Sequence, residues 1–494
     1  MYQPISQSLR YPDDMLAIIR NGLREQNRKL NVTIVGGGMS GLVSASLLKK
    51  AGHNVTILEG NNRVGGRVYT VRDPFTNGKY LDVGAMRIPV THKLTYEYID
   101  RFQLPINKFI NSSPKDILYA NGIKASRAEY EKNPDILGFP VEPDERGKTA
   151  TELFLSAVQP FYTLYENGDQ KQKEFLRRKF DRYSMENFLR YNPIGPSLSP
   201  NAVRMIKVLL GIEGFSELSF VDILTDIVNT VFNTDLEFNE ITGGNDKLPE
   251  SFIHQLEDNF LYNEKVHRLI QRPRNIVVQT RNQKTGDINT FKSDIVIMTV
   301  PFSVFQFIEV LPYHSFSFEK WKAIRELHYV ASMKIGIQFK ERFWEKEGLK
   351  GANLISDFPN RYTYTPSRTE DDPSSSGVLL ASYSWEDNAM LWNSLSLDQQ
   401  ITQSLEDLAK VHGKRVFDDY QVGTSFSWSQ NEFSGGCFTL YKPNQITEFE
   451  NVVTKPEGRV HFAGEHTSSF HGWIEGAIES GIRAAFEVNN RKDI

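Results

Sequence analysis

The sequence predicts a multidomain fold that combines α/β and α+β architecture. Three observations lead to this prediction: a β-branched run with a glycine-rich turn at residues 32–41, a helix-rich stretch at 127–236, and a second strand with a glycine turn at 459–465. A chain of 494 residues also exceeds what one hydrophobic core usually holds, so two or three domains are expected.

The first element is a βαβ unit of the Rossmann-like type. Residues 32–35 suit a buried parallel strand, which leads into Gly36-x-Gly38-x-x-Gly41 at the start of a helix. Gly36 makes the tight turn, Gly38 lets backbone N–H groups approach a pyrophosphate, and Gly41 lets the helix pack closely on the strand. Glu59 ends the second strand, where a carboxylate can accept hydrogen bonds from a ribose 2′-hydroxyl and disfavours a 2′-phosphate.

The segment Arg63-Val-Gly-Gly-Arg67 narrows the choice of dinucleotide. Its glycines permit close approach of the backbone, and its arginines can meet a pyrophosphate, which favours FAD over NAD. Because strand, glycines, helix, second strand and terminal acid all fall in register, we predict a Rossmann-like FAD-binding domain.

The middle of the chain has a different residue pattern. Leu, Phe and charged residues recur at helical spacing in residues 149–166, 170–191 and 202–211, which predicts a helical insertion. Strand patterns then return: residues 276–281 and 290–299 flank a Thr-Gly-Asp turn typical of a hairpin. Two further buried strands are expected at 294–301 and 334–339.

The C-terminal segment supplies a last strand at 459–462, a glycine turn, and a helix with small residues at Gly476, Ser480 and Ala484. The N-terminus of that helix would present positive potential to the N1 and C2-oxygen edge of a reduced flavin. Dinucleotide-binding elements at both ends of the chain imply discontinuous domains. We expect an FAD-binding domain at 26–72, 237–320 and 423–494, a mixed-sheet substrate-binding domain at 73–126 and 321–422, and a helical domain at 127–236.

Bulk properties exclude several other functions. The net charge is −4 with acidic and basic residues interspersed, so neither nucleic acid nor an anionic membrane surface is an expected partner. We find no signal peptide pattern and no run near 18 apolar residues, so no membrane association is expected. The single cysteine, Cys437, excludes an intrachain disulfide and a cysteine-based metal cluster, and favours a reducing, cytoplasmic location. His466 and His471 lack ligand-spaced partners, so no metal site is expected.

With these motifs, the chain resembles the flavin-dependent amine oxidase family, and within it most closely the L-amino acid oxidases. The similarity runs from about residue 30 to the C-terminus. Beyond the N-terminal fingerprint, it rests on Gly84-Ala-Met-Arg87-Ile-Pro89, Gly243-Gly-Asn-Asp-Lys-Leu-Pro249, Lys334, Arg361-Tyr-Thr-Tyr364, Trp428, Phe462-Ala-Gly-Glu465 and His471-Gly-Trp473.

The resemblance implies roles for individual residues. Arg87 would hold a substrate carboxylate together with the hydroxyl of Tyr364, with Tyr362 as the competing choice. Lys334 would hold a water against flavin N5, although spacing alone favours a lysine at a strand edge that reaches solvent. Trp473 and Phe438 would form aromatic walls around the amine. The FAD contacts implied are Gly36, Gly38, Met39, Ser40, Gly41, Glu59, Gly60, Arg67, Gly84, Ala85, Met86, Arg87, Val266, Trp428, Cys437, Gly464, Glu465, Gly472, Trp473 and Ile474.

Cys437 raises the question of covalent attachment. The segment Phe433-Ser-Gly-Gly-Cys437-Phe-Thr is similar to that of monoamine oxidases, in which the cysteine is thioether-linked to the flavin 8α-methyl group. L-amino acid oxidases generally hold FAD noncovalently. A covalent link and a small buried thiol lining the pocket therefore both stay open.

The resemblance implies an L-amino acid oxidase that deaminates L-amino acids oxidatively to 2-oxo acids, with release of ammonia and hydrogen peroxide. Its partners would be a small-molecule L-amino acid and O₂, and it would form a homodimer or a larger homo-oligomer. The alternatives are a monoamine or polyamine oxidase and a non-catalytic flavin-binding protein. Substrate side-chain preference would be set near residues 209–220, where Glu213 suggests either a basic substrate or a solvated helix end.

Overall fold

A five-stranded parallel sheet carries the predicted fingerprint. The computed structural model describes residues 9–224, 236–367 and 375–493. The strand order is β10-β2-β1-β14-β23. The strands are β1 (Asn31–Val35), β2 (Asn54–Glu59), β10 (Phe260–Tyr262), β14 (Ile295–Met298) and β23 (Val460–Phe462). Segments more than 400 residues apart along the chain therefore share one sheet.

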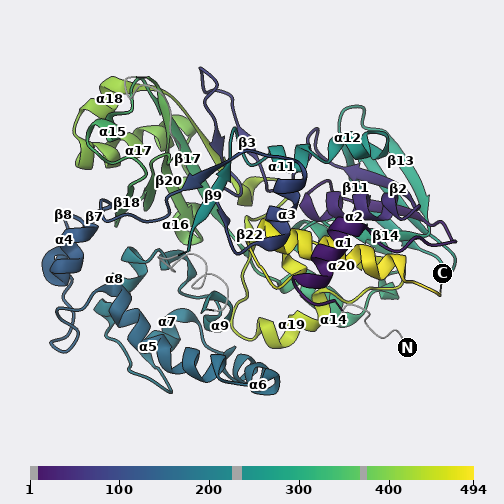
Figure 1. Cartoon of the computed structure of the whole chain (residues 1–494), viewed down its shortest axis with the longest axis horizontal. Helices are drawn as coiled ribbons and strands as arrows, with labels where there is room; N and C mark the ends of the chain where they lie inside the picture. Colours follow the sequence, from purple (N-terminus) through teal and green to yellow (C-terminus); the bar gives the residue numbers. More distant parts are fainter. Residues whose placement is uncertain (1–8, 225–235, 368–374, 494) are drawn as a thin grey trace.

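Two helices pack together against this sheet. Helix α2 (Met39–Lys50) follows β1, and helix α20 (Ile474–Asn489) lies beside it (Figure 1). The Oγ atom of Ser44 on α2 donates to the carbonyl oxygen of Gly481 on α20 at 2.9 Å. A Cβ atom at Gly41 would lie 2.1 Å from the Gly36 carbonyl oxygen, so only glycine permits this approach of helix and turn.

A second sheet has the order β13-β12-β11-β15. Its strands are β11 (Glu264–Gln271), β12 (Ile276–Asn282), β13 (Ile288–Ser293) and β15 (Glu309–Leu311). The antiparallel pair β12–β13 confirms the predicted hairpin. The predicted strand at 290–299 is wrong as one element, because the chain passes from β13 into β14 of the other sheet at Asp294. The carboxylate of Asp294 accepts the Asn31 N–H at 2.8 Å, which fixes this crossing.

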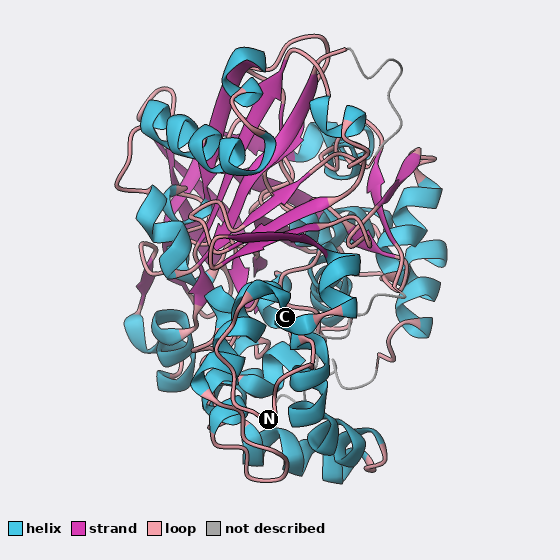
Figure 2. Cartoon of the chain, turned by 90° about the vertical axis from the view of Figure 1, so that its left-hand side faces the viewer, coloured by secondary structure: helices cyan, strands magenta, loops and turns pink. Residues whose placement is uncertain are grey.

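A seven-stranded mixed sheet has the order β21-β17-β20-β19-β18-β7-β8. Its strands are β7 (Ile117–Ala120), β8 (Ile123–Ser126), β17 (Ser332–Phe339), β18 (Asn353–Ser356), β19 (Tyr362–Tyr364), β20 (Gly377–Trp385) and β21 (Tyr420–Ser427). Figure 2 shows helices on the outside of the long strands. All eight residues of β17 are buried, which confirms the strand predicted at 334–339.

The helical insertion lies at the lower left of Figure 1. Its main helices are α5 (Ala150–Glu166), α6 (Gln170–Phe180), α7 (Met185–Arg190) and α8 (Pro200–Leu209). Capping boxes start α5 at Thr149 and α6 at Asp169. The predicted run 170–191 is two helices, because Ser184 caps a new one. Residues 225–235 of the predicted helical domain lie outside the described residues.

A three-stranded sheet has the order β5-β9-β6, and its strand β5 directly follows Arg87 in the sequence. It consists of β5 (Ile88–Pro89), β6 (Ile106–Phe109) and β9 (Phe238–Ile241). The strands of the five-stranded sheet come from the three segments assigned to the FAD-binding domain, while the domain boundaries themselves stay a prediction.

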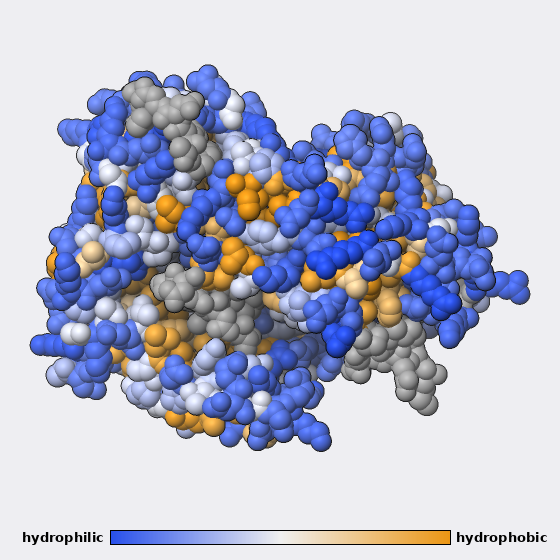
Figure 3. Space-filling model, viewed as in Figure 1, coloured by the Kyte–Doolittle hydropathy of each residue, from blue (hydrophilic) through white to orange (hydrophobic). Residues whose placement is uncertain are grey.

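The remaining elements are short or peripheral. They are α1 (Asp13–Asn21), α3 (Lys93–Arg101), α4 (Arg127–Lys132), α9 (Phe220–Asp222), α11 (Lys247–Glu250), α12 (Ile253–Leu256), α13 (Phe302–Phe305), α14 (Phe318–Glu326), α15 (Phe343–Lys346), α16 (Asp387–Trp392), α17 (Leu397–His412), α18 (Arg415–Asp419), α19 (Gln445–Val453), β3 (Thr70–Val71), β4 (Leu81–Asp82), β16 (Tyr329–Val330) and β22 (Phe438–Thr439). The face seen in Figure 3 is mostly hydrophilic with scattered apolar patches. Within the described ranges, no helix has the length and apolarity needed to cross a membrane.

Candidate active site

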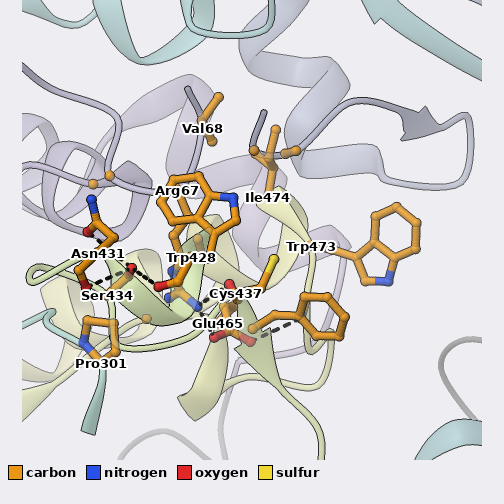
Figure 4. A pocket seen from close by; sticks show the side chains of 18 of the residues that line it. Arg67, Val68, Pro301, Trp428, Asn431, Ser434, Cys437, Glu465, Trp473 and Ile474 are labelled. Atoms are coloured by element: carbon orange, nitrogen blue, oxygen red, sulfur yellow. Dashed lines mark hydrogen bonds and ion pairs between the residues drawn. The ribbon is translucent and has the colours of Figure 1, made fainter. Parts of the chain in front are cut away.

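A cavity of about 610 Å³ is lined by all three major parts of the fold. Its lining includes the glycine turn after β1 and Glu59 at the end of β2. It also includes Arg87, residues of β19 and β20, and residues of the helical insertion. Further lining residues, several of which Figure 4 labels, come from the 428–438 and 464–474 segments.

The glycine turn forms a cradle suited to a phosphate group. Helix α2 begins after Gly38 with no side-chain cap, so its first N–H groups are available to an anion. Gly65 donates its N–H to the Gly37 carbonyl at 2.9 Å, which brings the Gly65-Gly66 turn against the cradle. Gly41 packs on Gly36 beneath the cradle and does not line the cavity. Its role as a direct cofactor contact stays a prediction.

Glu59 lies at the place expected of a ribose acceptor. Its carboxylate accepts the Gly37 N–H at 2.6 Å and the Asn61 N–H at 2.7 Å. Burial raises the pKa of Glu59, and the two N–H donors oppose that rise. Each carboxylate oxygen still has capacity for another donor, such as a hydroxyl group.

An ion pair and a hydrogen bond in the cavity wall join three segments that are far apart in the sequence (Figure 4). Arg67 Nη1 lies 2.6 Å from Glu465 Oε1 and donates to the Cys437 carbonyl at 3.0 Å. Glu465 Oε2 accepts the Gly472 N–H at 3.0 Å, which places the neighbouring Trp473. Trp473 precedes α20, and that helix also starts without a side-chain cap.

Two further predicted residues lie in the same region. The Trp428 indole N–H donates to the Val83 carbonyl at 2.8 Å, so the ring is fixed over the segment that leads to Arg87. Cys437 lines the cavity as a free thiol, and burial raises its pKa to about 11. Phe438 lines the cavity beside it.

Lys334 is buried behind the cavity wall and does not line the cavity. Its Nζ donates to the carbonyl oxygens of Asp82 at 3.0 Å and Gly84 at 2.7 Å, and lies 4.5 Å from the Tyr383 ring centroid. The interpretation as a strand-edge lysine reaching solvent is therefore wrong, because β17 is a central strand buried on both faces. Burial lowers the pKa of Lys334 to about 7. The water-holding role at flavin N5 stays a prediction.

Arg87 lines the cavity with no carboxylate partner in the ranges that the structure describes. Its Nη1 donates to Asn111 Oδ1 at 2.5 Å and to the Tyr364 hydroxyl at 3.3 Å. The structure thus brings Tyr364 to Arg87, whereas the Tyr362 hydroxyl approaches the Val208 carbonyl at 3.5 Å. Among the residues that the structure describes, Arg87 has no acidic partner for a structural ion pair, which is the alternative interpretation.

Residues expected near 209–220 contribute to the cavity, but Glu213 does not. Leu209, Leu210, Gly211 and Phe215 line it. Glu213 instead pairs with Arg204 and lies 3.2 Å from Arg361, so its carboxylate is engaged by two arginines and is not free in solvent.

Several residues that line the cavity could not be predicted from the sequence motifs. They are Asn111, Arg127, Thr151, Phe154, Tyr383 and Trp385. Tyr383 and Trp385 alternate along β20, so a period of two could have placed them on one face of a strand. Asn111 lies in a loop with no motif. Within the described ranges, no group of three His, Cys, Asp or Glu side chains could hold a metal ion.

The glycine cradle suits a dinucleotide and opens onto a cavity that is lined by Arg87, with the buried Lys334 behind its wall. This arrangement defines an oxidoreductase of the dinucleotide-binding class. Residues 39–489 match the model of the family described as flavin containing amine oxidoreductase, and the chain belongs to this family. Its cofactor is therefore a flavin, and its substrates are a small molecule and O₂.

Similar proteins carry related names. The chain is 46% identical over 477 residues to "Putative L-amino-acid oxidase YobN" of Bacillus subtilis (strain 168), covering 97% of this chain and 98% of the relative. It is 36% identical over 479 residues to an L-amino-acid oxidase of Siganus canaliculatus, covering 97% and 89%. Cyclohexylamine oxidase from Brevibacterium oxydans IH-35A has the same fold, with a TM-score of 0.73 at 18% identity over 94% of this chain and 99% of that one.

Proposed function

We propose that this protein is an FAD-dependent L-amino acid oxidase. The observation that carries the proposal is Arg87, a guanidinium in the cavity wall that is oriented by neutral partners and lacks an acidic one in the described part of the chain. A free amino acid brings a carboxylate, which a planar guanidinium binds bidentately. An amine without a carboxylate has no need of such a group.

The cavity fits FAD in particular. The uncapped start of α2 suits a pyrophosphate, and Glu59 suits ribose hydroxyls. The uncapped start of α20 suits the electron-rich edge of a flavin ring. Bound flavin supplies the acceptance of two electrons from the substrate and their transfer to O₂.

The side chains would orient the substrate and exclude water. Arg87 and the Tyr364 hydroxyl would hold the carboxylate, and Trp473 and Phe438 would confine the uncharged amine. The substrate loses two electrons and two protons to become an imino acid, which water hydrolyses to a 2-oxo acid and ammonia. The electrons reduce O₂ to hydrogen peroxide. No strong side-chain base is needed if the amine enters neutral.

Anaerobic mixing tests the proposal. The purified yellow protein is mixed singly with the twenty L-amino acids, with benzylamine and with putrescine, while the oxidised flavin band near ~450 nm is followed. Bleaching by amino acids alone supports the proposal. Bleaching by the amines alone would make the protein a monoamine or polyamine oxidase, and a protein that no substrate bleaches would be a flavin-binding protein without this turnover.

The mode of attachment has a separate test. The Cys437 thiol lines the cavity, but its raised pKa leaves little thiolate at neutral pH, which supports noncovalent binding. Denatured protein on a gel that keeps flavin fluorescence, and loses it in Cys437→Ala, would establish a thioether link instead.

The proposal extends to location and assembly. The single cysteine supports a cytoplasmic location, which cell fractionation tests. The resemblance to L-amino acid oxidases supports a homodimer or larger assembly, which light scattering after size exclusion tests.

A further inference from the structure

Two arginines of the cavity wall are held by one loop, residues 111–116, but by different kinds of acceptor. Arg87 Nη1 donates to the amide oxygen of Asn111 at 2.5 Å. Arg127 forms an ion pair with the carboxylate of Asp116, with Nε 3.0 Å from Oδ2. Both arginines line the cavity, so the loop provides a direct comparison of the two environments.

The carboxylate of Asp116 neutralises Arg127. Asp116 is fully buried and also accepts the N–H groups of Asn353 at 2.9 Å and Ser113 at 3.1 Å. A buried guanidinium–carboxylate pair has little remaining affinity for a second carboxylate, because the first already supplies the countercharge.

Arg87 keeps its charge uncompensated within the described ranges. A guanidinium carries only donors, so the Asn111 side chain must present its oxygen to it. Within the described part of the chain, Arg87 makes its side-chain hydrogen bonds to Asn111 and Tyr364 through Nη1. The edge formed by Nε and Nη2 is therefore left for a bidentate ligand.

Asn111 is itself fixed. Its carbonyl oxygen accepts the Asn353 side-chain N–H at 2.9 Å, and the preceding Ile110 N–H donates to Ser367 Oγ at 2.8 Å. The amide oxygen therefore has a defined place relative to β18 and can orient the guanidinium before a ligand arrives.

We propose that Asn111 is a positioning residue that orients Arg87 without neutralising it, so that the substrate carboxylate becomes its ionic partner. This inference rests on the proposed function and deepens it. It makes the neutrality of the side chain at position 111, rather than its size, the property that lets the cavity select amino acids over amines.

Two variants separate neutrality from packing. Asn111→Asp has the same shape but supplies a carboxylate, whereas Asn111→Ala removes the acceptor and leaves the charge of Arg87 free. If Asn111 acts only in packing, the isosteric Asp variant is the milder one. If it acts as proposed, the Asp variant is the more damaging one. Ser113→Ala, in the same loop and outside the cavity wall, is the matched control.

The probes are L-phenylalanine and phenethylamine, the same molecule without its carboxylate. Anaerobic rapid mixing at a series of concentrations gives the dissociation constant separately from the limiting rate of flavin bleaching. We expect Asn111→Asp to raise the dissociation constant of L-phenylalanine on the order of 100-fold, and Asn111→Ala to raise it about tenfold. The constant for phenethylamine should change less than about threefold in both. Flavin content and circular dichroism verify folding.

The outcomes distinguish the inference from the function beneath it. A wild-type protein that does not bind L-phenylalanine or any other amino acid would overturn the proposed function and this inference with it. The inference alone would be overturned if the wild type binds L-phenylalanine and the Asn111→Asp variant binds it equally well. The same holds if the Asp variant binds L-phenylalanine better than the Asn111→Ala variant does.

Discussion

The ion pair between Arg67 and Glu465 should be among the largest single contributions to the integrity of the cavity. The two side chains are only 20% and 7% exposed, and they join the N-terminal fingerprint to the C-terminal segment. Glu465→Gln keeps the shape but removes the charge. A glutamine has only one side-chain oxygen, so it can accept a hydrogen bond either from Arg67 or from the Gly472 N–H. Its NH₂ group would then face the other of these two donors, with which it cannot form a hydrogen bond.

The magnitude follows from burial. Breaking a buried pair by removing one partner costs about 3–5 kcal/mol, because the remaining charge is left uncompensated. The partial exposure of Arg67 favours the lower end, so we expect Glu465→Gln to lower the free energy of unfolding by about 3 kcal/mol. Arg67→Met should lose a similar amount. The double variant should lose at least about 2 kcal/mol less than the sum of the two, because it leaves no unpaired charge.

The assay is urea unfolding of all four proteins at one fixed concentration of free FAD, followed by flavin fluorescence. Fixing the ligand concentration is necessary because bound FAD stabilises the folded state by mass action. Losses in the single variants that add in the double variant to within about 0.5 kcal/mol would refute the reasoning, because additivity means that the two residues do not interact.

Three further predictions concern the recognition site, the buried lysine and the cradle. Arg87→Met should raise the KM for amino acids at least about 100-fold while FAD content stays unchanged, and an unchanged KM would remove Arg87 from carboxylate binding. The pKa of Lys334 is about 7 in the folded protein and about 10.5 when unfolded, so the unfolded state binds more protons between these values. Wild-type stability relative to Lys334→Met should therefore rise by about 1.4 kcal/mol per pH unit from pH 7 to pH 10, and a flat difference in urea unfolding would contradict this. Gly41→Ala should lose FAD on gel filtration, because its Cβ would lie 2.1 Å from a backbone oxygen of Gly36, and full FAD retention would show that the turn can yield.

The dinucleotide cradle could be predicted from the sequence because its requirements are local. Gly36 has a φ of 108°, and Gly41 has no room for a Cβ atom, so backbone geometry itself dictates the residue types. The strands beside the turn are short, β-branched and buried on both faces, which a single window of sequence also reveals. The strand near 459 and the helix after Trp473 were predictable for the same reason.

Lys334 shows where local reasoning fails. A lysine between apolar neighbours most often lies at a strand edge, but the sequence cannot show that β20 and β21 pair with β17 from both sides. Those partners decide that the side chain is buried, and burial decides its pKa. Only the resemblance to a family, and not the pattern of residues, assigned this position a role at the flavin, and that role stays a prediction.

At the proposed recognition site, the property that matters at Arg87 is set by its neighbours and not by Arg87 itself. An arginine binds a substrate carboxylate only if its own neighbours leave the charge uncompensated, and the neighbours that decide this are Asn111 and Tyr364, the latter 277 residues away. Arg127 has the same side chain, lines the same cavity and is held by the same loop, yet the carboxylate of Asp116 already neutralises it. Residue type alone would treat these two arginines as equivalent. The choice of amide or carboxylate in one loop distinguishes them, and only the folded structure shows which acceptor meets which arginine.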